Sequence, residues 1–334
     1  MMNRDTILII DSTTEHHFDT PCVERQINSG NDVVLTHISS LSELDEKFLH
    51  KASVILVWAC IPAIQFDDSF FKKTPHCQAI IKVAVGYDNI DVEAANKRQI
   101  QVFNIPDYGT EEVADHTIAL LLACVRKLKI SDDAVNKNQW DWSCIKPSVR
   151  LRGKTLGIIG FGRIGASVAL RAKSFGLNVQ FFDPYVVSGL DKSMGVVRTE
   201  NLDELLISSD FISVNASLNK TSYAMLNDQS FEKMRKGVVI INTARGAIID
   251  TPGLVNAFKS GKVSSAGLDV IQEEPRVHPY LKLNENVILT AHSAFYTEES
   301  FKEMRVKSAT MARDLLAGKS VRNEIRCTGY EGES

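Results

Sequence analysis

One segment decides the fold: Gly157-Ile158-Ile159-Gly160-Phe161-Gly162-Arg163-Ile164-Gly165. Its apolar first part predicts a buried strand, and its last three glycines form the pattern GxGxxG at a strand-to-helix turn. Glycines at this spacing let a pyrophosphate approach the backbone and meet the free N–H groups of a helix start. The same pattern also occurs as a tight packing turn, and that alternative stays open for the segment by itself.

A carboxylate downstream of the glycines favours NAD over NADP. Asp183 ends the next predicted strand, Val179–Phe182, and lies 18 residues after Gly165. At this position an aspartate accepts hydrogen bonds from the ribose hydroxyls of NAD. It also repels a 2′-phosphate, and Pro184-Tyr185 supply no compensating cation. A solvated turn before proline is the alternative for Asp183 alone, but together with the glycines it predicts a dinucleotide site.

The composition is that of an ordinary globular protein. The chain has 334 residues, 44% hydrophobic and 24% charged, and this length suggests two domains. A net charge of -3 offers no basic field to nucleic acid. The sequence shows no signal peptide, no run long enough to span a bilayer, and no CxxC pair among its six cysteines. We therefore expect a cytoplasmic protein with reduced thiols, no metal site, and no nucleic-acid or membrane partner.

Strand-like runs alternate with helical stretches along the chain, which predicts parallel α/β domains. Five runs precede the glycine segment: Ile7–Ile10, Asp32–Leu35, Val54–Trp58, Ile80–Val85 and Gln101–Ile105. Six more form a second series: Thr155–Ile159, Val179–Phe182, Phe211–Val214, Val238–Asn242, Ala266–Val270 and Val287–Thr290. Two doubly wound units are therefore expected, with the glycine segment at the start of the second.

A nearly apolar helix is predicted between the two series. Thr110 is its expected N-cap, and Glu111 and Glu112 suit the positive end of the helix dipole. Residues 118–125 are apolar all round, so we expect this helix to be buried between domains or subunits. We favour a subunit contact, and hence a homodimer.

Three polar side chains follow the last predicted strands, where ligands bind in an open parallel sheet. Arg245 carries a planar guanidinium that can donate two parallel hydrogen bonds to a carboxylate. Glu274 belongs to a carboxylate pair, and His292 follows the strand Val287–Thr290. Taken singly, each has an ordinary alternative: a surface arginine, a solvated acidic turn and a structural histidine.

Read together, these features resemble the D-isomer-specific 2-hydroxyacid dehydrogenase family over about residues 80–318. The matching segments are Val85–Asp91, the glycine segment with Asp183–Tyr185, Asn242–Gly246, Gly267–Pro275 and His292. Within the family, the branch of the C-terminal-binding-protein corepressors looks most similar. The resemblance implies an NAD-binding Rossmann domain over residues 104–293. It also implies a flavodoxin-like substrate domain built from residues 1–103 and 294–334.

The resemblance further implies that Arg245, Glu274 and His292 form a catalytic triad that reduces a 2-keto acid. Arg245 would bind the substrate, His292 would act as the acid and base, and Glu274 would hold and tune the imidazole. The implied cofactor contacts are Gly160, Gly162, Arg163, Ile164, Gly165, Asp183, Thr110, Thr243, Ala244, Arg245, Asp269, His292 and Phe295. The implied substrate contacts are Val85, Gly86, Tyr87, Arg245 and His292.

Two segments depart from the family pattern. Asn215-Ala216-Ser217-Leu218 stands where the family often has His-x-Pro-Leu beside the adenine, which leaves that contact open. Trp58-Ala59-Cys60-Ile61 stands where members that oxidise phosphoglycerate carry arginines. We therefore expect a small, non-phosphorylated 2-keto acid with an apolar or aromatic side chain, on which Phe295 would pack. Core packing is the alternative for Trp58 and Phe295.

An NADH-sensing binding protein of the corepressor type, with the same fold, is the alternative function. The complete triad discriminates poorly, because such corepressors also keep it. An adaptor of this kind is expected to carry a long extension, whereas eight residues follow Arg326. We therefore expect an NAD-dependent D-2-hydroxyacid dehydrogenase that works mainly as a 2-keto acid reductase.

Overall fold

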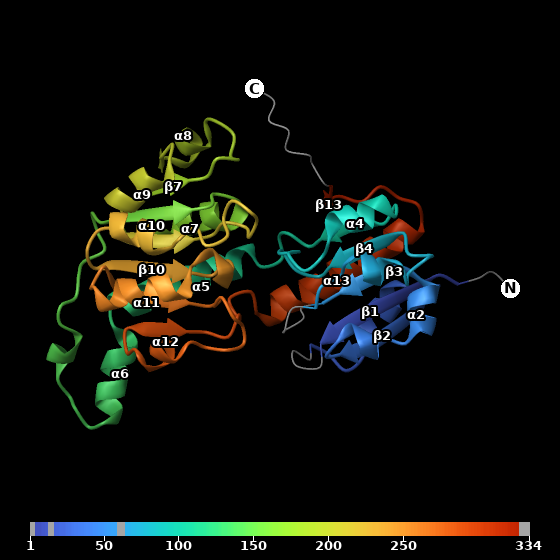
Figure 1. The fold of residues 1–334 in the computed structure, drawn as a ribbon, viewed down its shortest axis with the longest axis horizontal. Coiled ribbons are helices and arrows are strands. Elements are labelled where there is room, and N and C mark those ends of the chain that lie inside the picture. Colours follow the sequence, from blue (N-terminus) through green and yellow to red (C-terminus); the bar gives the residue numbers. More distant parts are fainter. Residues whose placement is uncertain (1–3, 13–16, 59–63, 327–334) are drawn as a thin grey trace. The chain divides into compact units, whose positions relative to one another are not determined.

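The computed structural model describes residues 4–12, 17–58 and 64–326, which form two compact units (Figure 1). Unit 1 is built from Met1–Gly109 and Thr297–Ser334, and unit 2 from Thr110–Tyr296. Each unit is a sheet of mainly parallel strands covered by helices on its faces. The predicted pair of doubly wound α/β units is therefore confirmed.

Unit 1 contains a six-stranded sheet in the order β13-β5-β4-β3-β1-β2. Its strands are β1 (Thr6–Ser12), β2 (Asp32–Ile38), β3 (Ala52–Val57), β4 (Ala79–Lys82), β5 (Gln101–Asn104) and β13 (Glu324–Ile325). The edge strand β13 pairs antiparallel with β5, while the other pairs are parallel. Without β13, this order is the flavodoxin-like arrangement.

The helices of unit 1 come from both of its chain segments, and α1 of the first packs against α13 of the second. They are α1 (Cys22–Ile27), α2 (Glu46–Lys51), α3 (Asp68–Phe71), α4 (Val92–Lys97), α13 (Glu298–Leu316) and a 3₁₀ turn at Leu41–Glu43. α13 begins after Thr297, which forms a capping box with Ser300. Arg305 on α13 lies 2.6 Å (Nη2 to Oε2) from the carboxylate of Glu24 on α1, which is fully buried.

Unit 2 contains a seven-stranded sheet in the order β12-β11-β10-β9-β6-β7-β8. Its strands, all parallel, are β6 (Thr155–Ile159), β7 (Asn178–Phe182), β8 (Val197–Arg198), β9 (Phe211–Val214), β10 (Val238–Asn242), β11 (Val263–Leu268) and β12 (Val287–Leu289). Counted from β6, this is the Rossmann order, with its reversal between β6 and β9. Ligands bind outside the carboxyl ends of the strands at such a reversal, and Gly160 follows β6 there.

Helix α5 is packed within unit 2. The helices of this unit are α5 (Thr110–Val125), α6 (Leu128–Asn136), α7 (Arg163–Ser174), α8 (Leu190–Met194), α9 (Leu202–Ser208), α10 (Asp228–Lys233), α11 (Thr251–Lys259) and α12 (Pro279–Leu283), with 3₁₀ turns at Trp142–Ile145 and Gly246–Ile248. Half of α5 is buried, including Ile118, Leu121 and Cys124, against α7, β10 and β11. This packing accounts for the apolar pattern without a subunit contact.

All eleven predicted strands are present, with some ends displaced. The predicted strand at Ile80–Val85 ends at Lys82, because the backbone bends at residues 83–85. β11 begins at Val263, three residues before its predicted start, because Ser264 and Ser265 interrupt its apolar pattern. The two-residue strands β8 and β13 were not predicted, since so short a segment carries no periodicity.

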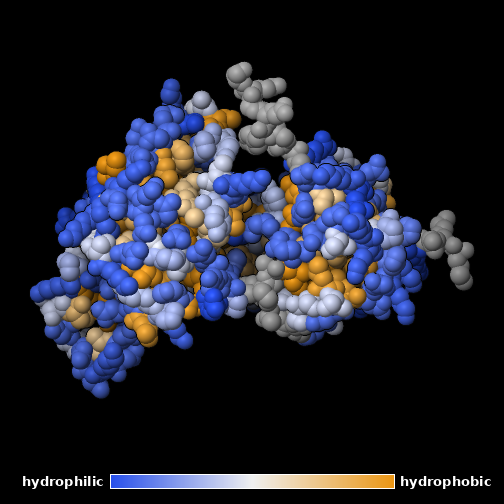
Figure 2. Space-filling view, viewed as in Figure 1, coloured by the Kyte–Doolittle hydropathy of each residue, from blue (hydrophilic) through white to orange (hydrophobic). Residues whose placement is uncertain are grey.

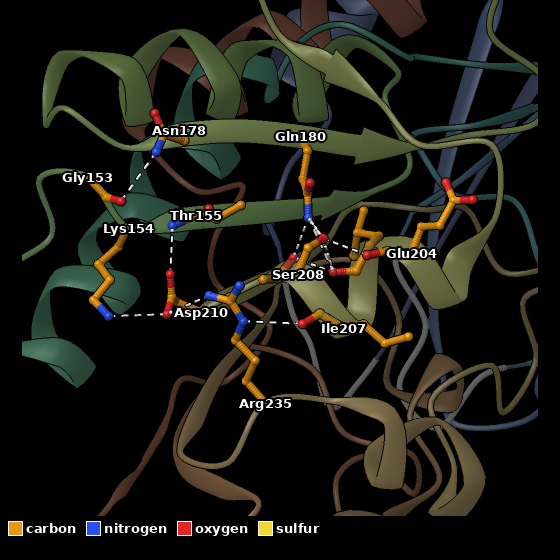
Figure 3. A network of polar contacts seen from close by, with 12 residues as sticks. Gly153, Lys154, Thr155, Asn178, Gln180, Glu204, Ile207, Ser208, Asp210 and Arg235 are labelled. Atoms are coloured by element: carbon orange, nitrogen blue, oxygen red, sulfur yellow. Dashed lines mark hydrogen bonds and ion pairs between the residues drawn. The ribbon is translucent and has the colours of Figure 1, made fainter.

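A polar network holds the amino ends of β6 and β9 (Figure 3). The Asp210 carboxylate accepts a hydrogen bond from the Thr155 N–H at 2.9 Å and lies 3.3 Å from Lys154 Nζ and 3.1 Å from Arg235 Nη1. Burial raises the pKa of Asp210, but the Thr155 and Lys154 hydrogen bonds and both cations together lower it below its ordinary value of 3.8. Because ligands bind at the opposite strand ends, we assign this network to the fold.

The surface visible in Figure 2 is mostly hydrophilic. Exposed apolar side chains gather on one segment of unit 2, residues 128–149, which we call the arm. Leu128, Trp140, Trp142 and Val149 are exposed there, with Trp140 at 90% and Trp142 at 72%. None of the helices in the described residues is long and apolar enough to cross a membrane.

Candidate functional site

The three glycines of the turn between β6 and α7 differ in their surroundings. Gly160 has a left-handed φ of +88°, and a Cβ there would stand 2.5 Å from the backbone of Ala216. A Cβ on Gly165 would stand 2.2 Å from the carbonyl oxygen of Gly160. At Gly162, by contrast, no described atom lies within 4 Å of an added Cβ. Packing therefore requires glycine at positions 160 and 165, whereas Gly162 borders open space.

Helix α7 presents its amino end at this turn. Gly162 is its N-cap, and no side chain in the described part of the chain caps it. The first N–H groups of a helix, here those of Arg163, Ile164 and Gly165, have no carbonyl partner within the helix. With the helix dipole, they form a binding place for an anion such as a pyrophosphate.

The carboxylate of Asp183 is held against the glycine turn. Its Oδ2 accepts a hydrogen bond from the Phe161 N–H at 2.7 Å, and its Oδ1 accepts one from the Tyr185 N–H at 2.9 Å. Each oxygen of a carboxylate has a second lone pair, so a ribose hydroxyl still finds an acceptor there.

Asn215 approaches the same turn from the end of β9. Its Oδ1 accepts a hydrogen bond from the Ser213 hydroxyl at 2.7 Å, while its buried Nδ2 has no partner among the described residues. Buried polar atoms are nearly always hydrogen-bonded in folded proteins, so an unpaired donor here fits a ligand acceptor. The residues around the turn therefore fit a dinucleotide.

Arg245, Glu274 and His292 follow three adjacent strands, β10, β11 and β12. His292 Nδ1 lies 2.9 Å from Glu274 Oε2, and Glu274 Oε1 accepts a hydrogen bond from the Ile271 N–H at 3.1 Å. Because a carboxylate only accepts, Nδ1 is the donor and Nε2 is the nitrogen left for a reactant. The His292 side chain is 35% exposed, so a ligand can reach it.

Arg245 lies on a turn that is fixed by its neighbours. The side chain of Asn242, the last residue of β10, donates a hydrogen bond to the Arg245 carbonyl at 3.0 Å. Gly246 packs on the chain that leads to Glu274, since a Cβ there would stand 1.9 Å from the Ile271 carbonyl. The Arg245 and Glu274 segments are therefore in direct contact.

Asp269, immediately after β11, organises the turn that carries His292. Its carboxylate accepts hydrogen bonds from the N–H groups of Ser293 at 2.9 Å and Ala294 at 3.0 Å, and its carbonyl accepts one from the His292 N–H at 2.8 Å. These bonds hold His292 at a φ of +51°, in the left-handed region that is uncommon for residues other than glycine. The predicted contact of Asp269 with the cofactor stays a prediction.

Two residues of α5 that sequence reasoning did not single out reach the same strand ends. His116 Nε2 lies 3.0 Å from the hydroxyl of Thr290, which follows β12. The Thr117 hydroxyl lies 2.7 Å from that of Thr243, which follows β10. Their only signal in the sequence is two polar residues together in a helix that is otherwise apolar toward the sheet.

The remaining predicted contacts lie in both units, and their roles stay predictions. In unit 2, Thr110 is the first residue of α5, and Thr243 and Ala244 follow β10. In unit 1, Val85, Gly86 and Tyr87 follow β4, with Tyr87 40% exposed.

The two aromatic candidates for substrate contact have different surroundings. Trp58, after β3, is fully buried, with its ring centroid 4.9 Å from that of Phe18 and 5.4 Å from that of Phe301. Core packing therefore explains Trp58. Phe295 is half-buried in unit 2. Residues 59–61, which weighed against a phosphorylated substrate, lie outside the described residues.

Comparison with known proteins finds relatives in sequence. Residues 118–294 match the model of the D-isomer specific 2-hydroxyacid dehydrogenase, NAD binding domain. Glyoxylate reductase of Pyrococcus furiosus is 36% identical over 286 residues, which cover 84% of this chain and 83% of that protein.

Two solved structures have the same fold and hold different dinucleotides. D-Lactate dehydrogenase from Aquifex aeolicus, complexed with NAD and lactic acid, gives a TM-score of 0.86 at 30% identity, over 98% of this chain and 100% of that one. An NADPH-dependent glyoxylate/hydroxypyruvate reductase from Sinorhizobium meliloti, in complex with NADP and malonate, gives 0.84 at 26% identity, over 97% of both chains.

Proposed function

This chain belongs to the D-isomer-specific 2-hydroxyacid dehydrogenase family, and from that premise we propose that it reduces a small, non-phosphorylated 2-keto acid with NADH. Family membership makes it an oxidoreductase that acts on CH–OH groups and binds NAD(P). The observation that carries the proposal is the 2.9 Å contact between His292 Nδ1 and Glu274 Oε2. An acid–base step needs an imidazole that is held by one nitrogen and presents the other.

The proposed mechanism gives each residue of the triad one task. Arg245 binds the substrate carboxylate, because a guanidinium offers two parallel donors to its two oxygens. The reduced dinucleotide, when bound at the glycine turn, supplies the hydride. His292 Nε2 donates a proton to the keto oxygen as the C2 hydroxyl forms, and Glu274 stabilises the protonated ring before that transfer. In oxidation of a 2-hydroxy acid, His292 takes the same proton back.

The proposed cofactor is NAD, on the evidence of Asp183. Its carboxylate lies beside the glycine turn and repels a 2′-phosphate, whereas the related structure from Sinorhizobium holds NADP. Fluorescence titration should give a Kd for NADH at least about tenfold below that for NADPH, a difference of about 1.4 kcal/mol. Asp183→Ser should remove most of that preference. Equal affinity of the wild-type protein for both cofactors would contradict the assignment.

The proposed assembly is a homodimer, and the arm supports it better than α5 does. Trp140 and Trp142 are 90% and 72% exposed, and exposed aromatic residues of this kind are typical of subunit contacts. Light scattering should give a dimer for the wild type and a monomer for the Trp140→Ser, Trp142→Ser double variant. A monomeric wild-type protein would contradict the proposal.

The test of the activity is NADH oxidation over a panel of 2-keto acids, including glyoxylate, pyruvate, phenylpyruvate and a phosphorylated member. We expect turnover of a non-phosphorylated acid, and a loss of about 10²- to 10⁴-fold in kcat for His292→Ala. His76→Ala, at an exposed histidine of unit 1, is the matched control. Equal turnover by wild type and His292→Ala would contradict the acid–base role. NADH binding without turnover of any acid would favour the corepressor-type alternative.

A further inference from the structure

We infer that His116 on α5 is a positioning residue for His292 and acts through the hydroxyl of Thr290 and the carboxylate of Asp269. The inference rests on the proposed acid–base role of His292. His116 lies inside unit 2 with 25% of its side chain exposed, on the helix that packs under β10 and β11.

The hydrogen bonds between these residues have a fixed direction. The Asp269 carboxylate only accepts, so the Thr290 hydroxyl, 2.5 Å from Oδ1, donates its single proton there. The Thr290 oxygen is then an acceptor toward His116 Nε2, 3.0 Å away. His116 must therefore carry a proton on Nε2, in both its neutral and its protonated form. His116 Nε2 also lies 3.7 Å from Asp269 Oδ1. The negative charge of that oxygen favours a proton on Nε2.

The other end of this chain of hydrogen bonds is the turn of His292. Asp269 Oδ1, which accepts from Thr290, also accepts from the Ser293 N–H, and Oδ2 accepts from the Ala294 N–H. The carbonyl of Asp269 holds the His292 N–H, at the φ of +51°. A carboxylate that shifts or rotates loosens these bonds together. His292 is then free to leave the left-handed region and its contact with Glu274.

Helix α5 is itself held in place by burial and by hydrogen bonds. It is half-buried, and the next residue, Thr117, bonds both to the Val113 carbonyl and to the Thr243 hydroxyl, at 2.7 Å each. Thr243 lies two residues before Arg245. Consecutive residues of one helix thus hold the ends of the two strands that present Arg245 and His292. A residue needed only for packing here would be apolar, like Ile118 and Leu120.

Two substitutions separate the hydrogen-bond donor from the bulk of the ring. In His116→Gln, the amide nitrogen reaches about as far as Nε2 and donates without titrating, whereas His116→Leu fills similar space without a donor. We expect His116→Leu to lower kcat about 10- to 100-fold, the scale of a small misplacement of a reacting group. The KM for the keto acid and the Kd for NADH should stay within about twofold. His116→Gln should stay within about threefold of wild type in kcat.

The pH profile of kcat and the ring ¹⁵N signals of His292 are readouts that packing alone does not move. In His116→Leu, the midpoint of the profile and the His292 signals should both shift, because the ring leaves its contact with Glu274. In His116→Gln, both should match wild type. His76→Gln, at the exposed histidine of unit 1, controls for the loss of a titrating group elsewhere.

Two results would overturn the inference: wild-type kcat and pH profile in His116→Leu, or a His116→Gln variant as impaired as His116→Leu. If thermal melting shows that His116→Leu does not fold, Thr290→Val and Thr290→Ser provide the same comparison, since only serine keeps the hydroxyl. Thr290→Val should then be impaired and Thr290→Ser should not. Failure of the proposed function is distinguishable, because His292→Ala would itself keep full turnover.

Discussion

Adding one methyl group at Gly162 should strongly weaken binding of NADH without unfolding the protein. Its φ of -75° suits alanine, and no described atom lies within 4 Å of the new Cβ. Alanine is a poorer N-cap than glycine but restricts the unfolded chain more, so the net change in stability should stay within about 1 kcal/mol. For a unit of this size, that is a Tm change of at most about 4 °C.

Gly165→Ala, in contrast, should lower the stability of the fold. Its Cβ would stand 2.2 Å from the Gly160 oxygen, against at least 3.4 Å in an ordinary contact. The helix or the turn must therefore move by about an ångström, and overpacking of this kind costs about 1–3 kcal/mol. We expect Tm to fall by roughly 3–10 °C.

Binding separates the two positions. A pyrophosphate at the turn approaches the backbone at the second glycine, so a methyl group on Gly162 occupies its place. The Kd for NADH should rise about 100-fold or more, which corresponds to about 2.8 kcal/mol. Calorimetric titration measures the Kd, and circular dichroism measures Tm. Gly30→Ala, at an open glycine of unit 1, is the matched control and should change neither.

Two outcomes would refute this reasoning. If Gly162→Ala binds NADH with wild-type affinity, the open space beside that residue is not the pyrophosphate site. If Gly165→Ala melts at the wild-type temperature, the contact with Gly160 does not restrict the turn.

Three further predictions concern stability and thiol chemistry. Because the folded pKa of Asp210 lies below its ordinary value of 3.8, its carboxylate stabilises the protein above that pH, and this contribution is lost as the pH falls through the lower folded value. Urea unfolding of Asp210→Asn should show a loss of about 1–2 kcal/mol at neutral pH and a weaker acid dependence, and an unchanged acid dependence would contradict this. Arg305→Met leaves the buried carboxylate of Glu24 without its partner and should cost about 3–5 kcal/mol in the same assay, whereas a loss below about 1 kcal/mol would argue against the pair. Burial raises the pKa of Cys77 to about 12 and that of Cys124 to about 11, so both thiols should resist alkylation at about pH 8 until urea is added, as mass spectrometry of their peptides will show. Rapid alkylation of either thiol in the folded protein would show that its surroundings open.

The sequence by itself determined the features that depend on short-range patterns. Alternating apolar runs located eleven strands, and their order along the chain predicted two parallel sheets. The glycine turn followed its strand as expected, and Arg245, Glu274 and His292 followed three others. Because parallel strands end at one edge of a sheet, strand assignment alone was enough to predict that these side chains share an edge. The pairing of Glu274 with His292, 18 residues apart, is found at that edge.

Tertiary structure decided what covers each surface and which distant groups meet. The apolar pattern of α5 showed that the helix is buried, but only the fold showed that α7, β10 and β11 bury it. His116 and Thr290 are 174 residues apart, and no local pattern links them. The left-handed backbone of His292 likewise depends on Asp269, 23 positions earlier, just after the neighbouring strand β11. Periodicity records whether a residue faces the interior, whereas a hydrogen bond depends on where separate helices and strands come together, which the packing of the whole unit sets.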